Sequence, residues 1–127
     1  KLREGEVALS PGMKYRHYAP KAPVLLLDGS PEKCAQYIGR QGKAHAALLC
    51  YHDDLDYFRT RFPALTVYDF GARGDEKTQA HELFYLLREA DKENFDEIYA
   101  PLPSKDGIGL ALYNRMIRAA AHHILVL

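Results

Sequence analysis

The hydrophobic positions of the chain fall into five short apolar runs with helical patterns between them. The runs predict strands at 24–28, 45–51, 65–70, 97–100 and 124–127. They are continuous rather than alternating, as is typical of strands buried on both faces. We therefore predict an α/β fold: an open, mostly parallel, doubly wound (Rossmann-like) sheet of about five strands with helices on both faces.

Local signals place helices between these strands. Ser30 followed by Pro31 resembles an N-cap with proline at the first helical position, and predicts a helix to about residue 39. Asp53 or Asp54 could cap a short helix ending near 61, and a further helix is predicted over 107–121. The strongest helix spans about 76–92, and its apolar stripe consists of Ala80, Leu83, Phe84, Leu87 and Ala90.

The first 23 residues have a different character from the rest. They contain three prolines, Pro11, Pro20 and Pro23, and no sustained period of a helix or strand. Such a stretch is typical of an extended linker. The predicted organisation is a linker over 1–23 and one α/β domain over 24–127.

Composition narrows the function classes. Seventeen basic residues balance seventeen acidic ones among 127, which argues against a dedicated nucleic-acid binder. No apolar run approaches the roughly 20 residues needed to cross a bilayer, and no signal peptide is recognisable, so no membrane partner is expected. The missing initiator methionine suggests a piece of a longer protein. Cys34 and Cys50 fit no metal spacing and are interpreted as reduced, buried thiols of a cytoplasmic protein.

Two glycine-containing loops follow predicted strands, where ligands of open parallel sheets tend to bind. In the first, Gly71, Arg73 and Gly74 are candidates for an anion site at a helix N-terminus. In the second, Gly107 and Gly109 are the candidates. Neither loop matches a dinucleotide or P-loop motif, and a tight turn with close helix packing explains both without a ligand.

No catalytic motif is recognisable in the predicted domain. The histidines form no set of metal ligands, so no bound metal is expected. No nucleophile elbow is present, and no catalytic residue is assigned.

The linker carries a denser set of reactive side chains. Lys14, Arg16 and His17 alternate with Tyr15 and Tyr18 inside the string SPGMKYRHYAP, residues 10–20. Lysine and arginine bind phosphates, and tyrosine stacks on bases or donates to a phosphate. This composition suits a nucleotide; a solvated basic linker whose tyrosines pack on the domain is the other interpretation.

The string SPGMKYRHYAP resembles the interdomain linker of long-form threonylcarbamoyl-AMP synthases, which have a YrdC-like catalytic domain. The following residues 22–29, APVLLLDG, resemble the first strand of their C-terminal domain. Residues 107–115, GIGLALYNR, resemble that domain's GLGxAixNRl signature. The resemblance spans essentially the whole chain, with Ser10 standing where many relatives have alanine.

The resemblance implies the function of a parent enzyme. That enzyme makes threonylcarbamoyl-AMP and pyrophosphate from threonine, bicarbonate and ATP with Mg²⁺, for the threonylcarbamoyladenosine modification of tRNA. Its catalytic domain has no counterpart in this sequence, so no cofactor and no independent activity are expected here. The implied partners are the N-terminal catalytic domain and, through Tyr15, Arg16, His17, Tyr18 and more weakly Lys14, ATP or the adenylate. The implied role is a regulatory lid that keeps water from a labile anhydride.

Two other functions stay open at this stage. One is a stand-alone Rossmann-like module that binds a small ligand or a protein. The other is an independent enzyme that uses the loop at 71–75 as an anion site.

Overall fold

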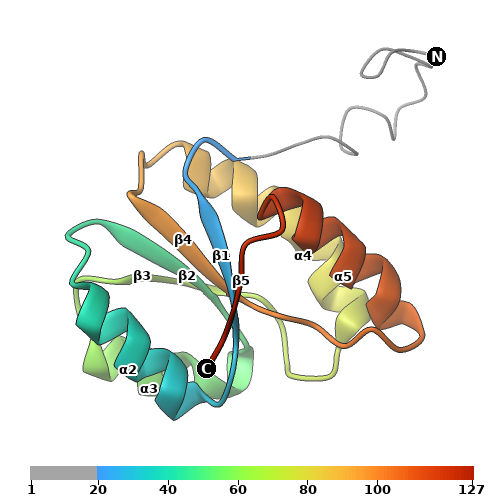
Figure 1. The fold of residues 1–127 in the computed structure, drawn as a ribbon, viewed down its shortest axis with the longest axis horizontal. Helices are drawn as coiled ribbons and strands as arrows, with labels where there is room; N and C mark the ends of the chain where they lie inside the picture. Colours follow the sequence, from blue (N-terminus) through green and yellow to red (C-terminus); the bar gives the residue numbers. More distant parts are fainter. Residues whose placement is uncertain (1–19) are drawn as a thin grey trace.

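The computed structural model describes residues 20–127, which form one α/β unit (Figure 1). Strands and helices alternate along the chain as the apolar runs predict. The strands are β1 Val24–Asp28, β2 Ala46–Cys50, β3 Thr66–Asp69, β4 Glu97–Pro101 and β5 Ile124–Val126. The helices are α2 Pro31–Gln41, the short 3₁₀ helix η1 His52–Asp54, α3 Leu55–Arg61, α4 Glu76–Asp91 and α5 Ile108–Ala119.

All the strand pairs are parallel, and the order across the sheet is β3-β2-β4-β1-β5. The prediction of an open, doubly wound parallel sheet is confirmed. The order differs from the 3-2-1-4-5-6 arrangement of dinucleotide-binding folds, because β4 lies between β1 and β2. The connection from β1 to β2 therefore crosses over β4.

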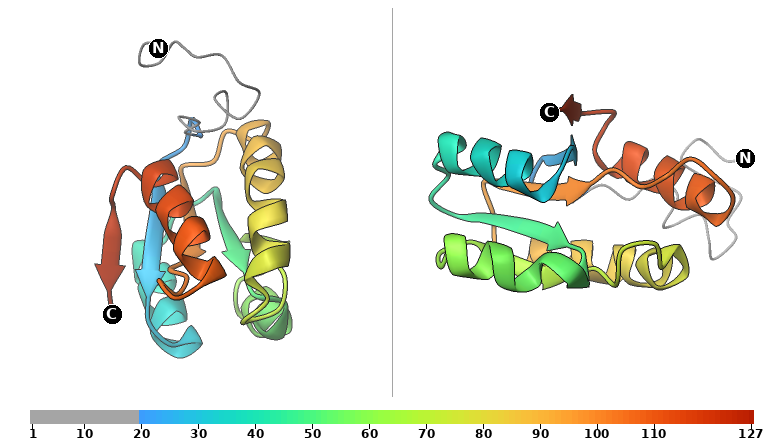
Figure 2. Two further views of the ribbon diagram at one scale, coloured as in Figure 1. Left: turned by 90° about the vertical axis from the view of Figure 1, so that its right-hand side faces the viewer. Right: turned by 90° about the horizontal axis from the view of Figure 1, so that it is seen from below.

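Helices cover both faces of the sheet, and each face has its own hydrophobic core. On one face, Ile38 of α2 and Phe58 of α3 pack against Leu48 and Tyr99. On the other face, α4 and α5 pack against the strands, and Figure 2 shows these two helices in front of the sheet with β5 at its edge. Every residue of β2 is buried, as expected for a strand covered on both sides.

Side-chain caps fix the starts of two helices. The hydroxyl of Ser30 accepts a hydrogen bond from the Lys33 N–H at 3.2 Å, which confirms Ser30 as the N-cap of α2. Asp75 caps α4 in the same way, accepting from the Thr78 N–H. Asp54 precedes α3 but does not cap it with its side chain.

The predicted stripe of α4 is only partly correct. Leu83, Leu87 and Ala90 are buried, and Ala80 and Phe84 are partly buried. Leu86 and Gln79, which the prediction left out, are also buried. Gln79 is 1% exposed, and its Nε2 donates to the Ala72 carbonyl at 2.8 Å. This bond removes the cost of burying the amide. No helix in the described part of the chain is long and apolar enough to cross a membrane.

Candidate functional site

A crevice opens at the carboxyl edge of the sheet because two neighbouring strands diverge there. The pairing of β2 with β4 ends at Leu48–Tyr99. Beyond this point β2 continues beside β3 to Cys50, and β4 continues beside β1 to Pro101. Both β1 and β2 connect to helices on the same face, and Cys34 of α2, Phe58 of α3 and Pro101 at the end of β4 all line the crevice. This is where ligands of open α/β sheets usually bind.

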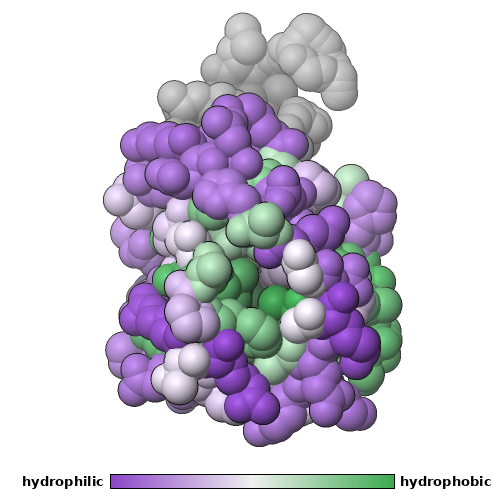
Figure 3. Space-filling view, turned by 90° about the vertical axis from the view of Figure 1, so that its left-hand side faces the viewer, coloured by the Kyte–Doolittle hydropathy of each residue, from purple (hydrophilic) through white to green (hydrophobic). Residues whose placement is uncertain are grey.

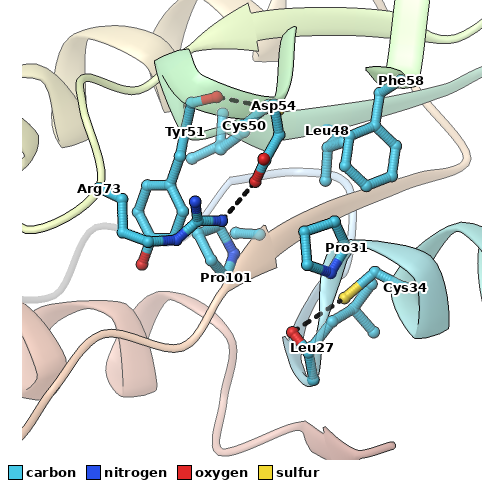
Figure 4. Close-up of a pocket in the computed structure, with 13 residues that line it drawn as sticks. Leu27, Pro31, Cys34, Leu48, Cys50, Tyr51, Asp54, Phe58, Arg73 and Pro101 are labelled. Atoms are coloured by element: carbon cyan, nitrogen blue, oxygen red, sulfur yellow. Dashed lines mark hydrogen bonds and ion pairs between the residues drawn. The ribbon is translucent and has the colours of Figure 1, made fainter.

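The crevice is small: its cavity volume is about 50 Å³, within about 390 Å³ of empty space that includes open solvent. Figure 4 shows side chains from α2, β2, η1 and the β3–α4 loop pointing toward it. Its walls are mainly apolar, and the polar groups at its mouth are Tyr51, Asp54 and Arg73. An apolar pocket with a few convergent polar groups is the usual form of a small-molecule site.

Arg73 is held at the mouth by two contacts of its side chain and one of its backbone. Its guanidinium forms an ion pair with Asp54, and this hydrogen bond is the main reason why the pKa of Arg73 is raised. The same group lies 5.0 Å from the ring centre of Tyr51, a cation–π contact. The backbone N–H of Arg73 donates to Asp53 at 2.7 Å, and this bond is the largest cause of the lowered pKa of Asp53.

A second pair joins the same two loops. His52 Nδ1 lies 2.9 Å from a carboxylate oxygen of Asp69, whose other oxygen accepts from the Gly71 N–H at 3.0 Å. The hydrogen bond to Asp69 raises the pKa of His52, and the same bond lowers the pKa of Asp69. The backbone of His52 also donates to the Gly71 carbonyl at 2.9 Å. The loops after β2 and β3 are therefore fixed to each other.

Neither cysteine of the crevice is an activated nucleophile. Cys34 and Cys50 are both unbridged, as predicted, but only Cys50 is buried, whereas Cys34 is partly exposed. The pKa is raised to about 11 for Cys34 and to about 12 for Cys50. Burial is the largest cause in both cases, and nearby aspartates add to it. Both thiols stay protonated at neutral pH, whereas catalytic cysteines need the thiolate.

The first predicted anion loop lies at this crevice. Gly71 and Gly74 have φ values of +98° and +88°, which explains glycine at both positions. The backbone donors of Gly71 and Arg73 are already bonded to carboxylates. The arrangement accounts for the loop as a structural turn, while anion binding there stays a prediction.

The second predicted anion loop precedes α5. The Gly109 N–H donates to the Asp106 carbonyl at 2.9 Å, and the Asp106 N–H to the Ser104 hydroxyl at 3.0 Å. A Cβ on Gly109 would lie 2.6 Å from the Ser104 carbonyl oxygen, so the close approach of helix and loop requires glycine. Gly107 has a φ of +55° at the start of the helix. Anion binding at this loop, too, stays a prediction.

The remaining predicted site residues, Lys14 to Tyr18, lie outside the described residues. Sequence reasoning missed Tyr51 and Asp54, which the structure brings to Arg73. Their place directly after the second apolar run was the available signal, because that position is also a carboxyl end of a strand. Among residues 20–127 no three side chains of metal-binding type come together.

Similarity to known proteins agrees with this architecture. A family model described as the threonylcarbamoyl-AMP synthase C-terminal domain matches residues 1–121. The threonylcarbamoyl-AMP synthase of Bacillus subtilis is 33% identical over 124 residues, which are 96% of this chain and 35% of that protein. The Pyrococcus abyssi protein of the same name is 32% identical over 127 residues, which are 94% of this chain and 34% of that protein. The chain thus spans about a third of the length of these curated relatives.

Solved structures give the same result. Pyrococcus abyssi Sua5 complexed with L-threonine superposes with a TM-score of 0.64 and 27% identity, over 93% of this chain and 34% of that one. A variant of Pyrococcus abyssi Sua5, with alanine in place of a histidine and the tyrosine after it, superposes with a TM-score of 0.63 and 28% identity. The match covers 93% of this chain and 33% of that one. The C-terminal Sua5 domain of Pyrococcus horikoshii, which is 23% identical, shares the fold with a TM-score of 0.56. The match covers 86% of this chain and 100% of that one.

Proposed function

The chain belongs to the threonylcarbamoyl-AMP synthase C-terminal domain family, and we propose that it is the regulatory domain, with its linker, of a two-domain enzyme. The parent enzyme converts threonine, bicarbonate and ATP with Mg²⁺ into threonylcarbamoyl-AMP and pyrophosphate. The N-terminal catalytic domain carries the chemistry. This chain closes the nucleotide site and does not catalyse the reaction itself.

The observation that carries this proposal is the extent of the family match. The match runs from residue 1 to residue 121, so it includes the stretch predicted to be a linker and the α/β domain as far as the end of α5. The chain covers only about a third of its relatives, so two thirds of their length lies elsewhere.

The linker is the part of the chain with nucleotide-binding chemistry. Arg16 offers a bidentate fork for phosphate, and Tyr15 and Tyr18 offer rings and hydroxyls for a base, phosphate or carbonyl. This sequence has one histidine followed directly by tyrosine, His17–Tyr18. A pair of the same type is replaced in the Pyrococcus abyssi variant, so His17–Tyr18 is a suitable target in this family.

The end of the linker is attached to the α/β domain by specific contacts. The Lys21 backbone N–H donates to Asp91 at 2.9 Å, and its ammonium group lies 3.5 Å from the Asn94 side-chain oxygen. The Pro23 carbonyl accepts from the Ile98 N–H at 2.9 Å. These contacts support a lid mechanism, because a pull on the linker acts on the end of α4 and the start of β4. Closure over the adenylate would exclude water from its mixed anhydride.

Pyrophosphate release from ATP, with threonine and bicarbonate, tests the proposal. We would compare the full-length protein, its catalytic domain alone, and residues 1–127. The expected result is full activity only for the full-length protein and none for residues 1–127. A catalytic domain that is equally active alone would reduce this chain to a tether and contradict the regulatory role.

A further inference from the structure

The crevice at the carboxyl edge of the sheet combines an apolar space with two opposite charges. Leu27, Leu48 and Phe58 form part of its apolar wall, while Asp54 and Arg73 lie at its mouth. In Figure 4 the Asp54 carboxylate and the Arg73 guanidinium point toward one another beside this space. A ligand that matches the crevice has a small apolar part joined to a charged head.

The ion pair at the mouth leaves binding capacity on both of its partners. It joins Nη2 of Arg73 to Oδ2 of Asp54, and neither side chain makes another hydrogen bond within residues 20–127. A guanidinium has five N–H donors, and a carboxylate has a second acceptor oxygen. The side chain of Arg73 is 49% exposed and that of Asp54 is 17% exposed, so solvent reaches both. A ligand can therefore bind beside the pair, with an anion at Arg73 and a cation at Asp54.

A wider hollow on another side of the molecule lacks this combination of charges. It lies between the ends of α2 and α3 and has a cavity volume of about 280 Å³. Figure 3 shows it with hydrophobic residues inside and hydrophilic ones around it. The charged residues that line it, Lys43 and Arg61, are both cations. A head group that carries both charges therefore matches the crevice rather than the hollow.

The size of the crevice limits the apolar part of the ligand. Its cavity volume is about 50 Å³, whereas one water molecule needs roughly 10–15 Å³ on this measure. The space therefore holds a group of about three to five heavy atoms, such as a branched side chain of three carbons. An aromatic ring is too large. Because the wall is mainly apolar, a methyl group is favoured there over a hydroxyl, which would lose its hydrogen bonds to water.

We propose that the carboxyl-edge crevice binds a free amino acid with a small, branched aliphatic side chain. The ammonium group of the amino acid pairs with Asp54, and its carboxylate pairs with Arg73. Its side chain enters the space beside Cys34 and Phe58. The four charges then alternate in sign, so that each lies next to two opposite charges. This proposal concerns the α/β domain alone and does not depend on the role of the linker.

The test measures the binding of small molecules to residues 1–127 by calorimetry and saturation-transfer NMR. L-Valine has the proposed side chain and both charges, whereas 3-methylbutanoate lacks the ammonium group and isobutylamine lacks the carboxylate. Valine is expected to bind at least tenfold more tightly than either, the effect of one hydrogen bond to a charged group. It should exceed glycine by at least as much, because each buried carbon adds roughly fourfold. No saturable binding of valine, or affinity equal to that of glycine or of 3-methylbutanoate, overturns the proposal.

Variants at the mouth locate the binding. Asp54→Asn removes the anionic partner and Arg73→Gln removes the cationic one, so each should weaken valine binding at least tenfold. The matched controls, Asp56→Asn and Arg40→Gln, change the same charges outside the crevice and should leave the affinity unchanged. Melting temperatures show that each variant is folded. Valine affinity that Asp54→Asn and Arg73→Gln both leave unchanged overturns the proposal.

Variants in the wall test the position of the side chain. Cys34→Leu adds volume to the wall of the crevice, so it should weaken valine binding at least tenfold. Cys34→Ala enlarges the space instead, and should allow leucine to bind as tightly as valine. A ratio of leucine to valine affinity that is the same in Cys34→Ala as in the unmodified chain contradicts this placement.

Discussion

The close approach between α5 and the loop before it makes a quantitative prediction for Gly109→Ala. The backbone of Gly109 is helical, so alanine is allowed conformationally. Its Cβ, however, would lie 2.6 Å from the Ser104 carbonyl oxygen, whereas ordinary contact begins near 3.4 Å, so the two must separate by 0.8 Å. Overpacking of this kind costs about 1–3 kcal/mol, and replacing a helical glycine returns up to about 1 kcal/mol.

We therefore expect Gly109→Ala to lower the free energy of unfolding by about 1–2 kcal/mol. Urea denaturation followed by circular dichroism measures this as a decrease of roughly 1 M in the midpoint, with an unchanged slope. The matched control is Gly39→Ala, also in a helix, whose Cβ meets nothing closer than 3.5 Å. Gly39→Ala should be neutral or stabilising. If both variants gained stability equally, the steric explanation of Gly109 would be refuted.

Three further predictions concern the rest of the domain. Asp75→Ala removes the cap of α4 and its bonds to Thr78, and should cost about 1 kcal/mol by the same urea assay; an unchanged midpoint would contradict the cap. Because the pKa of His52 is raised, its contact with Asp69 stabilises the fold fully below about pH 6.5, and this stabilisation is lost as the pH rises through the raised pKa. Because the pKa of Asp69 is lowered, the same stabilisation is also lost at acidic pH, as the pH falls through the lowered pKa of Asp69. Asp69→Asn should lower the NMR-measured pKa of His52, and no change would refute the pairing. Cys34 and Cys50 should resist alkylation at pH 8 in the native state and react in urea, because burial, with help from nearby aspartates, raises their pKa values to about 11 and 12. Rapid labelling of both in the native state would contradict these raised pKa values.

The positions of the strands and helices could be predicted from the sequence because they depend on local patterns. Ser30 and Pro31 marked the start of α2, and continuous apolar runs marked strands covered on both faces. The strand order could not be predicted in this way. The insertion of β4 between β1 and β2 depends on contacts between segments far apart in the chain, and the apolar runs resemble one another too closely to specify their neighbours.

The same limit applies to the candidate site. The sequence indicated Arg73 as an anion-binding residue, but Asp54 lies 19 positions earlier and meets it only because β2 and β3 are adjacent. Gln79 is polar and was not part of the predicted apolar stripe of α4, yet its hydrogen bond to Ala72 allows it to be buried. The edge-to-face contact of Tyr99 with Tyr37 of α2 is likewise visible only once the helices are placed on the sheet.

The most direct test of the central claim is pyrophosphate release by the full-length protein with Tyr15 and Tyr18 both replaced by alanine. The lid account predicts at least a tenfold loss of activity with an unchanged melting temperature. Tyr85→Ala, on the exposed side of α4, is the matched control and should retain activity. Activity of the double variant equal to that of the unmodified enzyme would contradict the account and leave the linker as a tether.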